Sequence, residues 1–343
     1  MIRGYKYLLI AVIAVAAVLT TCNHPKDDDE IVIHDDPECK ITLMTNQITE
    51  IEFRMTGKTK CRIDWGDHSE IEEVEFSNLW EYHFQHRYII DEPHVITISG
   101  DDVLSLTFFG EVFTGIDVSK DTALRSLTFY NTQIKNLDLS QNISLMILDC
   151  NNNRQLTGLD LSKNTALQEL RCDYNRQFTE LDVSNNVKLT ILNCFNNELA
   201  ELDVSKNTAL KYLDCSFNLL TNIDVSANTE LQQFHCHTNQ LTQLDMSKNV
   251  KLNFLICGNN LLTELDMTNN TLIENIDCSY NRIEVAAFSA LFESLPDNSL
   301  QEIKQSYITV NHNPGALTCQ RAIAEKKGWW VYDGTGVVIP SVH

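Results

Sequence analysis

One pattern recurs nine times in this chain with a period of 21 or 22 residues, and it restricts the fold more than any other feature. From Leu210 the pattern reads L-K-Y-L-D-C-S-F-N-L-L and then T-N-I-D-V-S-A-N-T-E, after which Leu231 begins the next copy. Such regular repetition predicts one structural unit per copy, stacked on its neighbours. The copies begin at Val103, Leu124, Leu145, Leu167, Leu189, Leu210, Leu231, Leu252 and Ile273.

Within each copy the first, fourth and sixth positions are apolar, and we expect the third, fifth and seventh to point outward. This alternation predicts a short strand with one buried side. A single strand cannot bury that side alone, so successive copies are expected to stack as coils about 4.8 Å apart, with their strands in a parallel sheet. The frame L-x-x-L-x-(L/C)-x-x-N-x-L resembles the leucine-rich repeat, which implies a leucine-rich-repeat solenoid over residues 103–283.

The sixth position is cysteine in seven consecutive copies. Neighbouring Cβ atoms in such a column would lie about 4.8 Å apart, whereas a disulfide needs about 3.8 Å. We therefore predict buried free thiols that pack as small apolar side chains, with metal or redox chemistry as the alternative. A cysteine in this slot resembles the cysteine-ladder repeats of the internalin family. The seven residues are Cys150, Cys172, Cys194, Cys215, Cys236, Cys257 and Cys278.

Two polar positions recur as well: an asparagine at position nine and an aspartate in the return half, L-D-V-S-x-N. An amide both donates and accepts, so the asparagines are expected to bond backbone groups where the chain leaves the strand. The aspartates, each with Ser or Thr two residues later, are expected to cap turns; a calcium site is the weaker alternative, because no D-x-D-x-D-G loop accompanies them. The positions are Asn153, Asn175, Asn197, Asn218, Asn239, Asn260 and Asn281, and Asp117, Asp138, Asp160, Asp182, Asp203, Asp224, Asp245 and Asp266.

The first 22 residues have the pattern of a secretory signal: Arg3 and Lys6 precede an apolar run over residues 7–19. That run is shorter than the about 20 residues that a membrane-spanning helix needs. Leu19-Thr20-Thr21-Cys22 resembles the bacterial lipobox, which implies that Cys22 carries a lipid anchor, although Thr21 departs from the usual small residue. An ordinary signal peptide with an incidental cysteine is the alternative.

Residues 23–30 are polar and acidic, so they are expected to form a solvated tether. A lysine and acidic cluster just after the lipidated cysteine resembles the surface-export signal of Bacteroidota lipoproteins. The resemblance implies an outer membrane lipoprotein exposed at the cell surface, with the lipid as its only membrane contact. A charged linker without a targeting role is the alternative.

Residues 31–102 lack the repeat and are expected to form a small all-β domain. I-D-W-G-D at 63–67, H-R-Y at 86–88 and V-I-T-I at 95–98 resemble a PKD-like (polycystic-kidney-disease-type) β-sandwich, in which the D-W-G-D turn is structural. His68 departs from the glycine usual in that family. Cys39 and Cys61 are left open as a possible disulfide. Strands are expected at 40–44, 51–55, 60–64, 82–88 and 94–99.

Both ends of the repeat region depart from the frame. The first two copies carry Phe108 and Phe129 in the cysteine slot, which suits a junction with the β-domain near residue 103. Residues 284–343 are expected to close the open end of the sheet. There we predict a helix at 286–295, a strand-like turn at 307–313, a closing helix at 316–327, a strand at 329–332 and a core-facing Cys319.

Motifs for enzyme chemistry, such as G-x-S-x-G, H-E-x-x-H, a P-loop or a dinucleotide fingerprint, do not occur in the sequence. We therefore expect no enzyme, no catalytic residue and no cofactor. The net charge of −21 argues against nucleic acid or an anionic membrane surface as a partner. His235, His237 and Asp214 are a weak zinc candidate, and ordinary surface roles for them are favoured.

The outward positions of the strands carry many aromatic residues, which on a rigid concave sheet are typical anchors of a binding surface. The alternative is that bulky residues only stiffen the sheet. The candidate binding residues are Phe109, Tyr130, Arg171, Tyr174, Phe195, Tyr212, Phe217, His235, Phe254 and Tyr280. A polar rim is expected from Asp149, Arg171, Asp173, Asp214, His235 and Asp277.

Three functions remain open at this point. The first is a surface-anchored module that presents the concave sheet to a protein partner, as an adhesin or a receptor-like factor. The second is a carbohydrate-binding component of a surface nutrient-capture system, in which the aromatic rings stack on sugars. The third is a structural spacer. A partner screen and a glycan array would separate them.

Overall fold

The computed structural model describes residues 39–46, 48–77, 81–100, 102–176, 178–300 and 306–334. The chain divides into two compact units, Met1–Asn164 and Thr165–His343. The predicted signal peptide (1–22), its candidate lipid site Cys22 and the tether (23–30) lie outside the described residues.

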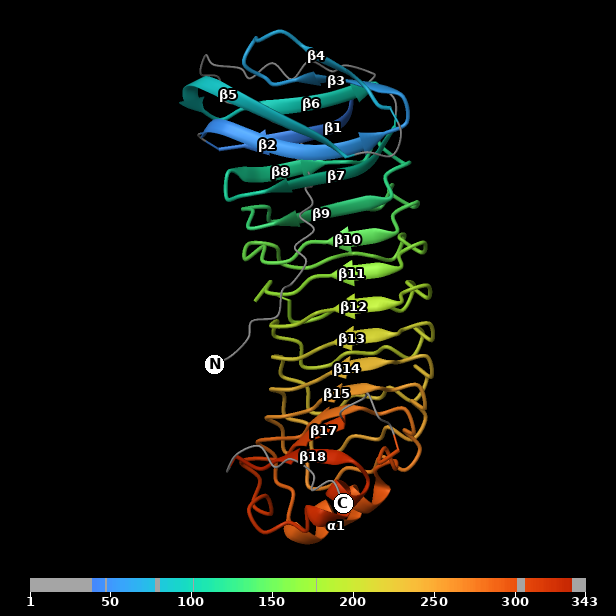
Figure 1. The fold of residues 1–343 in the computed structure, drawn as a ribbon. Helices are drawn as coiled ribbons and strands as arrows, with labels where there is room; N and C mark the ends of the chain where they lie inside the picture. The colour runs from blue at the N-terminus through green and yellow to red at the C-terminus, as the bar shows by residue number, and fades with distance from the viewer. Residues whose placement is uncertain are drawn as a thin grey trace. The chain divides into compact units, whose positions relative to one another are not determined.

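The first unit contains two sheets (Figure 1). One has the strand order β4-β3-β6-β1-β8, and the other contains the run β5-β2-β7-β9-β10. The five strands predicted between residues 40 and 99 are confirmed, whereas β4 was missed because Val74 is its only apolar residue. The strands are β1 Cys39–Thr45, β2 Ile48–Gly57, β3 Lys60–Asp64, β4 Glu72–Glu75, β5 Tyr82–Glu92, β6 Val95–Gly100, β7 Val103–Phe109, β8 Phe113–Asp117, β9 Ser126–Tyr130 and β10 Ile147–Asp149.

Strand β7 forms one antiparallel and one parallel pairing in the first unit. It pairs antiparallel with β2, with Phe108 opposite Phe53, and parallel with β9, with Phe108 opposite Phe129. The return half of the first copy then forms β8, which pairs antiparallel with β1. The first copy of the repeat is therefore shared between the two sheets, and its buried Phe108 packs on Phe113 at 3.9 Å between ring centroids.

The D-W-G-D turn has the structural role that the sequence indicates. His86 Nε2 lies 2.8 Å from Asp67 Oδ2, and the His86 ring stacks on Trp65. The Tyr88 hydroxyl donates to the Trp65 carbonyl over 3.0 Å. Cys61 is a free, buried thiol, so the possible Cys39–Cys61 disulfide gains no support, and the Cys39 side chain lies outside what the structure describes.

Asp121 stands in the return half of the first copy, where later copies have asparagine, and it is fully buried. Its carboxylate accepts the N–H groups of Val103 (2.9 Å) and Ala123 (3.2 Å). In the next coil Asn142 instead donates its amide to the carbonyl groups of Val118 and Asp121. The side chain at position 121 therefore faces backbone N–H donors rather than carbonyl acceptors. A carboxylate, which only accepts hydrogen bonds when ionised, suits this environment. Burial raises the pKa of Asp121 to about 6, although the two backbone N–H groups oppose the shift.

The second unit is a stack of parallel strands with two short helices (Figure 1). Neighbouring strands pair position by position, as when Leu213 lies opposite Leu192 on one side and Phe234 on the other. The predicted 21-residue β-solenoid is therefore confirmed in this unit. The strands are β11 Glu169–Arg171, β12 Ile191–Asn193, β13 Tyr212–Asp214, β14 Gln233–His235, β15 Phe254–Ile256, β16 Asn275–Asp277, β17 Ser306–Thr309 and β18 Trp329–Tyr332; the helices are α1 Val285–Ser294 and α2 Ala322–Lys326.

The predicted closing helix over 316–327 is wrong in extent, because only α2 (Ala322–Lys326) is helical. Residues 316–321 form turns, in which Ala316 N–H donates to Asn313 O and Thr318 N–H donates to Gly315 O. Gly315 packs directly on the backbone of Glu284 and Val285, and a Cβ there would lie 2.4 Å from Val285 N. Cys319 is half-buried rather than in the core, and its thiol donates to Ala316 O.

The cysteine column is confirmed as a set of buried thiols, since all seven are fully buried and none forms a disulfide. In the second unit the thiols reach the next coil: Cys194 Sγ lies 3.4 Å from Asp214 O, and Cys278 Sγ lies 3.4 Å from Thr309 O. Burial raises the pKa of Cys194 and of Cys215 well above the ordinary thiol value. These groups therefore stay protonated and act as packing atoms.

The asparagine and aspartate predictions are also confirmed. Asn218 donates to the carbonyl groups of Cys194 and Cys215, each over 3.0 Å, and so ties two coils together. Asp203 Oδ1 accepts the Ser205 N–H over 2.8 Å, and the other seven return aspartates do the same to the residue two positions on.

A second asparagine column, in the return half, was not assigned a role from the sequence. Asn228 is fully buried and donates to the carbonyl groups of Val204 (3.0 Å) and Asn207 (2.9 Å). The same pair of bonds recurs at Asn249 and Asn270. Each coil is therefore fastened to its neighbour by one amide at the end of the strand and another in the return segment.

Candidate binding face

All ten predicted binding residues reach the surface, three of them with exposed aromatic rings: Tyr174 is 44% exposed, Phe217 42% and Tyr280 52%. The other seven are half-buried between neighbouring coils. The candidates from Tyr174 to Tyr280 belong to the second unit. We use the name strand face for the outward side chains of strands β11–β18 together with the residue in the turn after each strand.

The predicted polar rim is only partly correct. Asp149 and Asp214 are buried rather than exposed, at 9% and 8%. Asp214 Oδ1 accepts the Ser216 N–H over 3.0 Å, so this carboxylate closes the turn after its own strand. Arg171 is half-buried and pairs with Glu169, with 2.5 Å between Nε and Oε1. The outward positions are therefore filled mainly by rings, while several charged groups serve the backbone.

Four aromatic rings form a continuous row in the second unit, here called the edge cluster. Tyr174 meets Phe195 edge-on at 5.0 Å between centroids, and Phe195 meets Phe217 at 5.1 Å. Phe217 then meets His237 at 5.1 Å. Each step crosses from one coil to the next, so a side chain at one position is supported by the rings above and below it.

A second row, the central cluster, lies on the strands themselves. The His235 ring packs between Tyr212, at 5.4 Å, and Phe254, at 5.3 Å. His235 Nδ1 lies 3.5 Å from Asp214 Oδ2. Burial alone would raise the pKa of Asp214, but the bond and charge of His235 together with the Ser216 N–H leave that pKa below its usual value. The carboxylate is therefore ionised beside the imidazole.

The zinc alternative gains no support from this geometry. Among the residues that the structure describes, no group of three or more His, Cys, Asp or Glu side chains is placed to hold a metal ion. Burial also lowers the pKa of His237, which packs in the edge cluster. Both histidines act here as members of the aromatic rows.

The eighth position of each coil has a left-handed backbone conformation, so the type of residue found there is informative. Asparagine tolerates this conformation, and it fills the position at Asn131 (φ 57°), Asn152 (53°), Asn196 (55°) and Asn259 (55°). Tyr174 (φ 59°), Phe217 (53°) and Tyr280 (51°) adopt the same conformation with bulky side chains. Such residues are rare there because the conformation costs on the order of 1–2 kcal/mol.

Two further ring pairs are stacked with nearly parallel planes. Tyr280 stacks on His312 at 4.0 Å with 14° between the planes, in the second unit. In the first unit Phe109 stacks on Tyr130 at 5.2 Å with 7° between the planes. A cavity of about 340 Å³ adjoins Phe109 and is also lined by Glu50, Glu52 and Gln85.

Several aromatic residues of the strand face were missed from the sequence. They are Tyr307, His312, Trp330 and Tyr332, of which Tyr307 is 42% exposed and meets the Tyr332 ring at 6.4 Å. The strand at 307–313 was predicted, but only its inward residues were considered. The signal was available, because Tyr307 and His312 hold the third and eighth positions of a further copy that resumes after α1.

Comparison with known proteins points to leucine-rich-repeat solenoids. The functional domain of InlJ from Listeria monocytogenes, which includes a cysteine ladder, is 35% identical with a TM-score of 0.56; the match covers 64% of this chain and 46% of that domain. The internalin inlF from Listeria monocytogenes is 18% identical (TM-score 0.40; 62% and 77% covered). A leucine-rich-repeat protein from Leptospira interrogans is 16% identical (TM-score 0.45; 63% and 73% covered).

No protein-family model and no curated protein matches the sequence. The chain spans just under half the length of the InlJ domain, so that protein's activity does not carry over as a finding. The match to the InlJ domain, which includes a cysteine ladder, nevertheless supports a fold of the leucine-rich-repeat type. The solenoid part of the predicted fold, a β-solenoid with a 21-residue period and few helices, is thereby confirmed. Within its described part, the chain has no helix of the length and apolar character that a membrane crossing requires.

Proposed function

We propose that this protein is a non-enzymatic binding module whose strand face takes a protein partner. The observation that carries the proposal is the set of exposed aromatic rings at left-handed positions, Tyr174, Phe217 and Tyr280. Backbone strain of this kind persists where the surroundings hold it and often marks a functional site.

The physical argument rests on alternatives that the chain itself uses. Asparagine occupies the same position at Asn196 and Asn259 without that cost. The rings at Phe217 and Tyr280 do not recover it by full burial, since 42% and 52% of these residues stay exposed. Large aromatic side chains, held rigidly by neighbouring rings, are the residues that most often dominate the binding energy of protein interfaces.

The proposed setting is the bacterial cell surface. In it, residues 1–22 are a lipoprotein signal, Cys22 carries the lipid, and residues 23–30 form the tether. Residues 31–102 form a PKD-like β-sandwich, residues 103–283 the solenoid and residues 284–343 a cap that covers its end. The resemblance of the lipobox and of the acidic segment to Bacteroidota lipoproteins supports an outer membrane location, with adhesion or receptor-like binding as the role.

Replacing all three strained aromatics by asparagine tests the proposal. The variant Y174N/F217N/Y280N keeps the backbone conformation, because asparagine already stands at equivalent positions. Partners are first captured with the full chain from extracts of neighbouring cells, and their affinities are then measured by surface plasmon resonance. We expect the triple variant to lose at least tenfold in affinity for a partner that binds this face.

The control is V187S/V250S, which removes two exposed aliphatic side chains outside the strand face, at 50% and 47% exposure. It should leave the affinity within twofold. Unchanged capture of every partner by Y174N/F217N/Y280N would contradict the proposal.

Carbohydrate binding is the second candidate function, and the two stacked ring pairs favour it. Tyr280 stacks on His312, and Phe109 on Tyr130, with nearly parallel ring planes, and such aromatic faces are suited to stacking against a sugar. A glycan array with the full chain separates the two candidates. Strong saccharide binding that Y280N abolishes, together with no captured protein, would favour this second function.

A further inference from the structure

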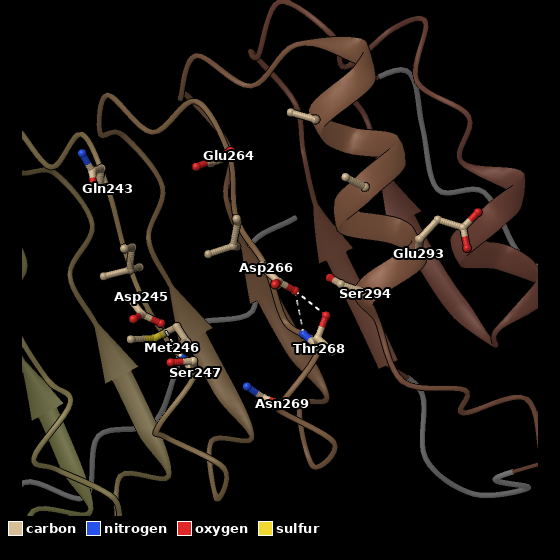
Figure 2. Close-up of a pocket in the computed structure, with 14 residues that line it drawn as sticks. Gln243, Asp245, Met246, Ser247, Glu264, Asp266, Thr268, Asn269, Glu293 and Ser294 are labelled. Atoms are coloured by element: carbon tan, nitrogen blue, oxygen red, sulfur yellow. Dashed lines mark hydrogen bonds between the residues drawn. The ribbon is translucent and has the colours of Figure 1, made fainter.

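A groove of about 690 Å³ lies in the second unit, away from the strand positions (Figure 2). Two consecutive return segments, around Asp245 and Asp266, form one side, and helix α1 forms the other through Ala287, Ala290 and Ser294. None of the predicted binding residues lines it.

The groove exists because the chain forms α1 after Ile283 instead of another return segment of the usual kind. The helix buries Phe288, Leu291 and Phe292 against the solenoid. Its side toward the groove carries the small Ala287 and Ala290, which leave the space open. The Ser294 hydroxyl accepts the Met267 N–H over 3.0 Å and fixes the helix end to the coil beside it.

The charge of this groove is of one sign. Four carboxylates line it, from Asp245, Glu264, Asp266 and Glu293, and its described lining contains no Lys, Arg or His. Figure 2 shows Asp245 and Asp266 on adjacent segments, with Asp266 beside Thr268 and Ser294. The four acidic residues are all exposed, so their ionised carboxylates are accessible to a ligand.

The two aspartates are oriented by the turns that they cap. Asp245 Oδ1 accepts the Ser247 N–H over 2.8 Å, and Asp266 Oδ1 accepts the Thr268 N–H over 2.9 Å. The Ser247 backbone bond lowers the pKa of Asp245. In each of these bonds Oδ1 is the acceptor. Each coil therefore holds one carboxylate in place, with about 4.8 Å between coils.

The base of the groove is apolar. Met246 and Leu265 are buried beneath the carboxylates, and Leu244 is half-buried beside them. Lysine and arginine combine a cationic head with an aliphatic stem of three or four carbons, and such side chains lay the stem on apolar surface while the head meets a carboxylate. The groove is complementary to both parts of these side chains.

We propose that this groove docks a basic, Lys- or Arg-bearing segment of a partner protein. The carboxylates at Asp245, Glu264 and Asp266 would receive the cationic heads, and Leu244, Ala287 and Ala290 would contact the stems. The negative charge of the lining disfavours an anionic partner. This docking surface is separate from the strand face, so a partner can engage it whether or not the strand face binds a protein.

Fluorescence anisotropy with a labelled octalysine peptide and the full chain tests the proposal. The variant D245N/E264Q/D266N removes three negative charges, and asparagine keeps an oxygen for each capped turn. The matched control E180Q/D182N/D203N removes the same three charges from equivalent return positions that do not line the groove. At 50 mM NaCl we expect the groove variant to bind at least tenfold more weakly than the native chain, and the control to bind within twofold of it.

A second variant, A290W, fills the groove without changing its charge and should weaken octalysine binding at least fivefold, with its melting temperature recorded beside the native value. Equal weakening by the two triple variants would show that the peptide senses net charge alone and would overturn the proposal. Undiminished binding to A290W, or no binding by the native chain, would also overturn it. The variant Y174N/F217N/Y280N should bind octalysine normally, so failure here is distinguishable from failure at the strand face.

Discussion

In the second unit the return segments and the strand face are built from the same coils, yet they differ in how much they vary. Every return segment repeats an aspartate that caps a turn, and a buried asparagine fastens one segment to the next, as at Asp203 and Asn228. The outward positions change from coil to coil, from Tyr212 to His235 to Phe254 in the central cluster. The comparison teaches that repeated polar residues hold this fold together, whereas the varied aromatic residues are the ones that we propose to bind a partner.

The sharpest test of the repeated side is Asn228→Ala. The carbonyl groups of Val204 and Asn207 would each lose the Asn228 amide and keep one backbone donor, from Asn207 and Leu210 respectively, and each lost bond contributes about 0.5–1.5 kcal/mol. We expect the free energy of unfolding, measured by urea denaturation, to fall by about 1–3 kcal/mol. The control Asn269→Ala, at an exposed position, should cost under about 0.5 kcal/mol. A small effect of Asn228→Ala would contradict the view that the return segments stabilise the fold more than the strand face does.

Asp121 tests the repeated column where it departs from asparagine. Its pKa is raised to about 6 in the folded chain, against about 3.9 for an unfolded aspartate, so the folded state binds the proton more tightly. Stability from this group is complete below about pH 4, falls as the pH rises from about 4 to 6, and is level above that, with a total loss of about 2–3 kcal/mol. Urea titrations should show this fall for the native chain and a flatter profile for Asp121→Asn. Stability that rises over this window, once Asp121→Asn is subtracted, would contradict the assignment.

The cysteine column should behave as packing rather than as chemistry. Cys215→Ser replaces a fully buried thiol by a smaller, more polar hydroxyl, and we expect a loss of about 2 kcal/mol in the free energy of unfolding. Cys319→Ser, at a half-buried position, should cost less than half of that. A thiol reagent should label the ladder cysteines only after unfolding, and rapid labelling of the folded chain would count against this interpretation.

The smallest expected effect lies on the varied side. Phe217→Asn relieves the left-handed strain but loses ring contacts with Phe195 and His237, so stability should rise by between zero and about 1 kcal/mol. The reverse change at an equivalent position, Asn259→Phe, should cost about 1 kcal/mol. Thermal unfolding measures both. A clear loss of stability in Phe217→Asn would mean that this ring serves the fold, and the strand face would lose its main support.

Much of the solenoid was predictable because each position of a repeat meets the same environment in every coil. The burial of Cys215, the bonds of Asn218 and the turn capped by Asp203 all follow from that regularity. The candidate binding residues were found for the same reason, since outward positions are recognised by their place in the frame. What was missed on this face, such as Tyr307 and His312, follows the one interruption of the frame, at α1.

Other features needed contacts that no single copy encodes. The pairing of β8 with β1 joins residues that are about 70 positions apart, and the buried Asp214 lies 3.5 Å from His235 of the next coil. The α1 groove forms only where a helix replaces a return segment. Gly315 likewise packs against the backbone at Val285, which no pattern within one copy reveals.

The sequence by itself determined the period, the inward columns of thiols and amides, and the capped turns, because these depend on local geometry repeated at a constant spacing. The tertiary structure decided which outward side chains stay exposed, which carboxylates are buried, and where a helix leaves a groove. Those outcomes depend on how neighbouring coils and the end of the stack share space, and a periodic pattern does not carry that information.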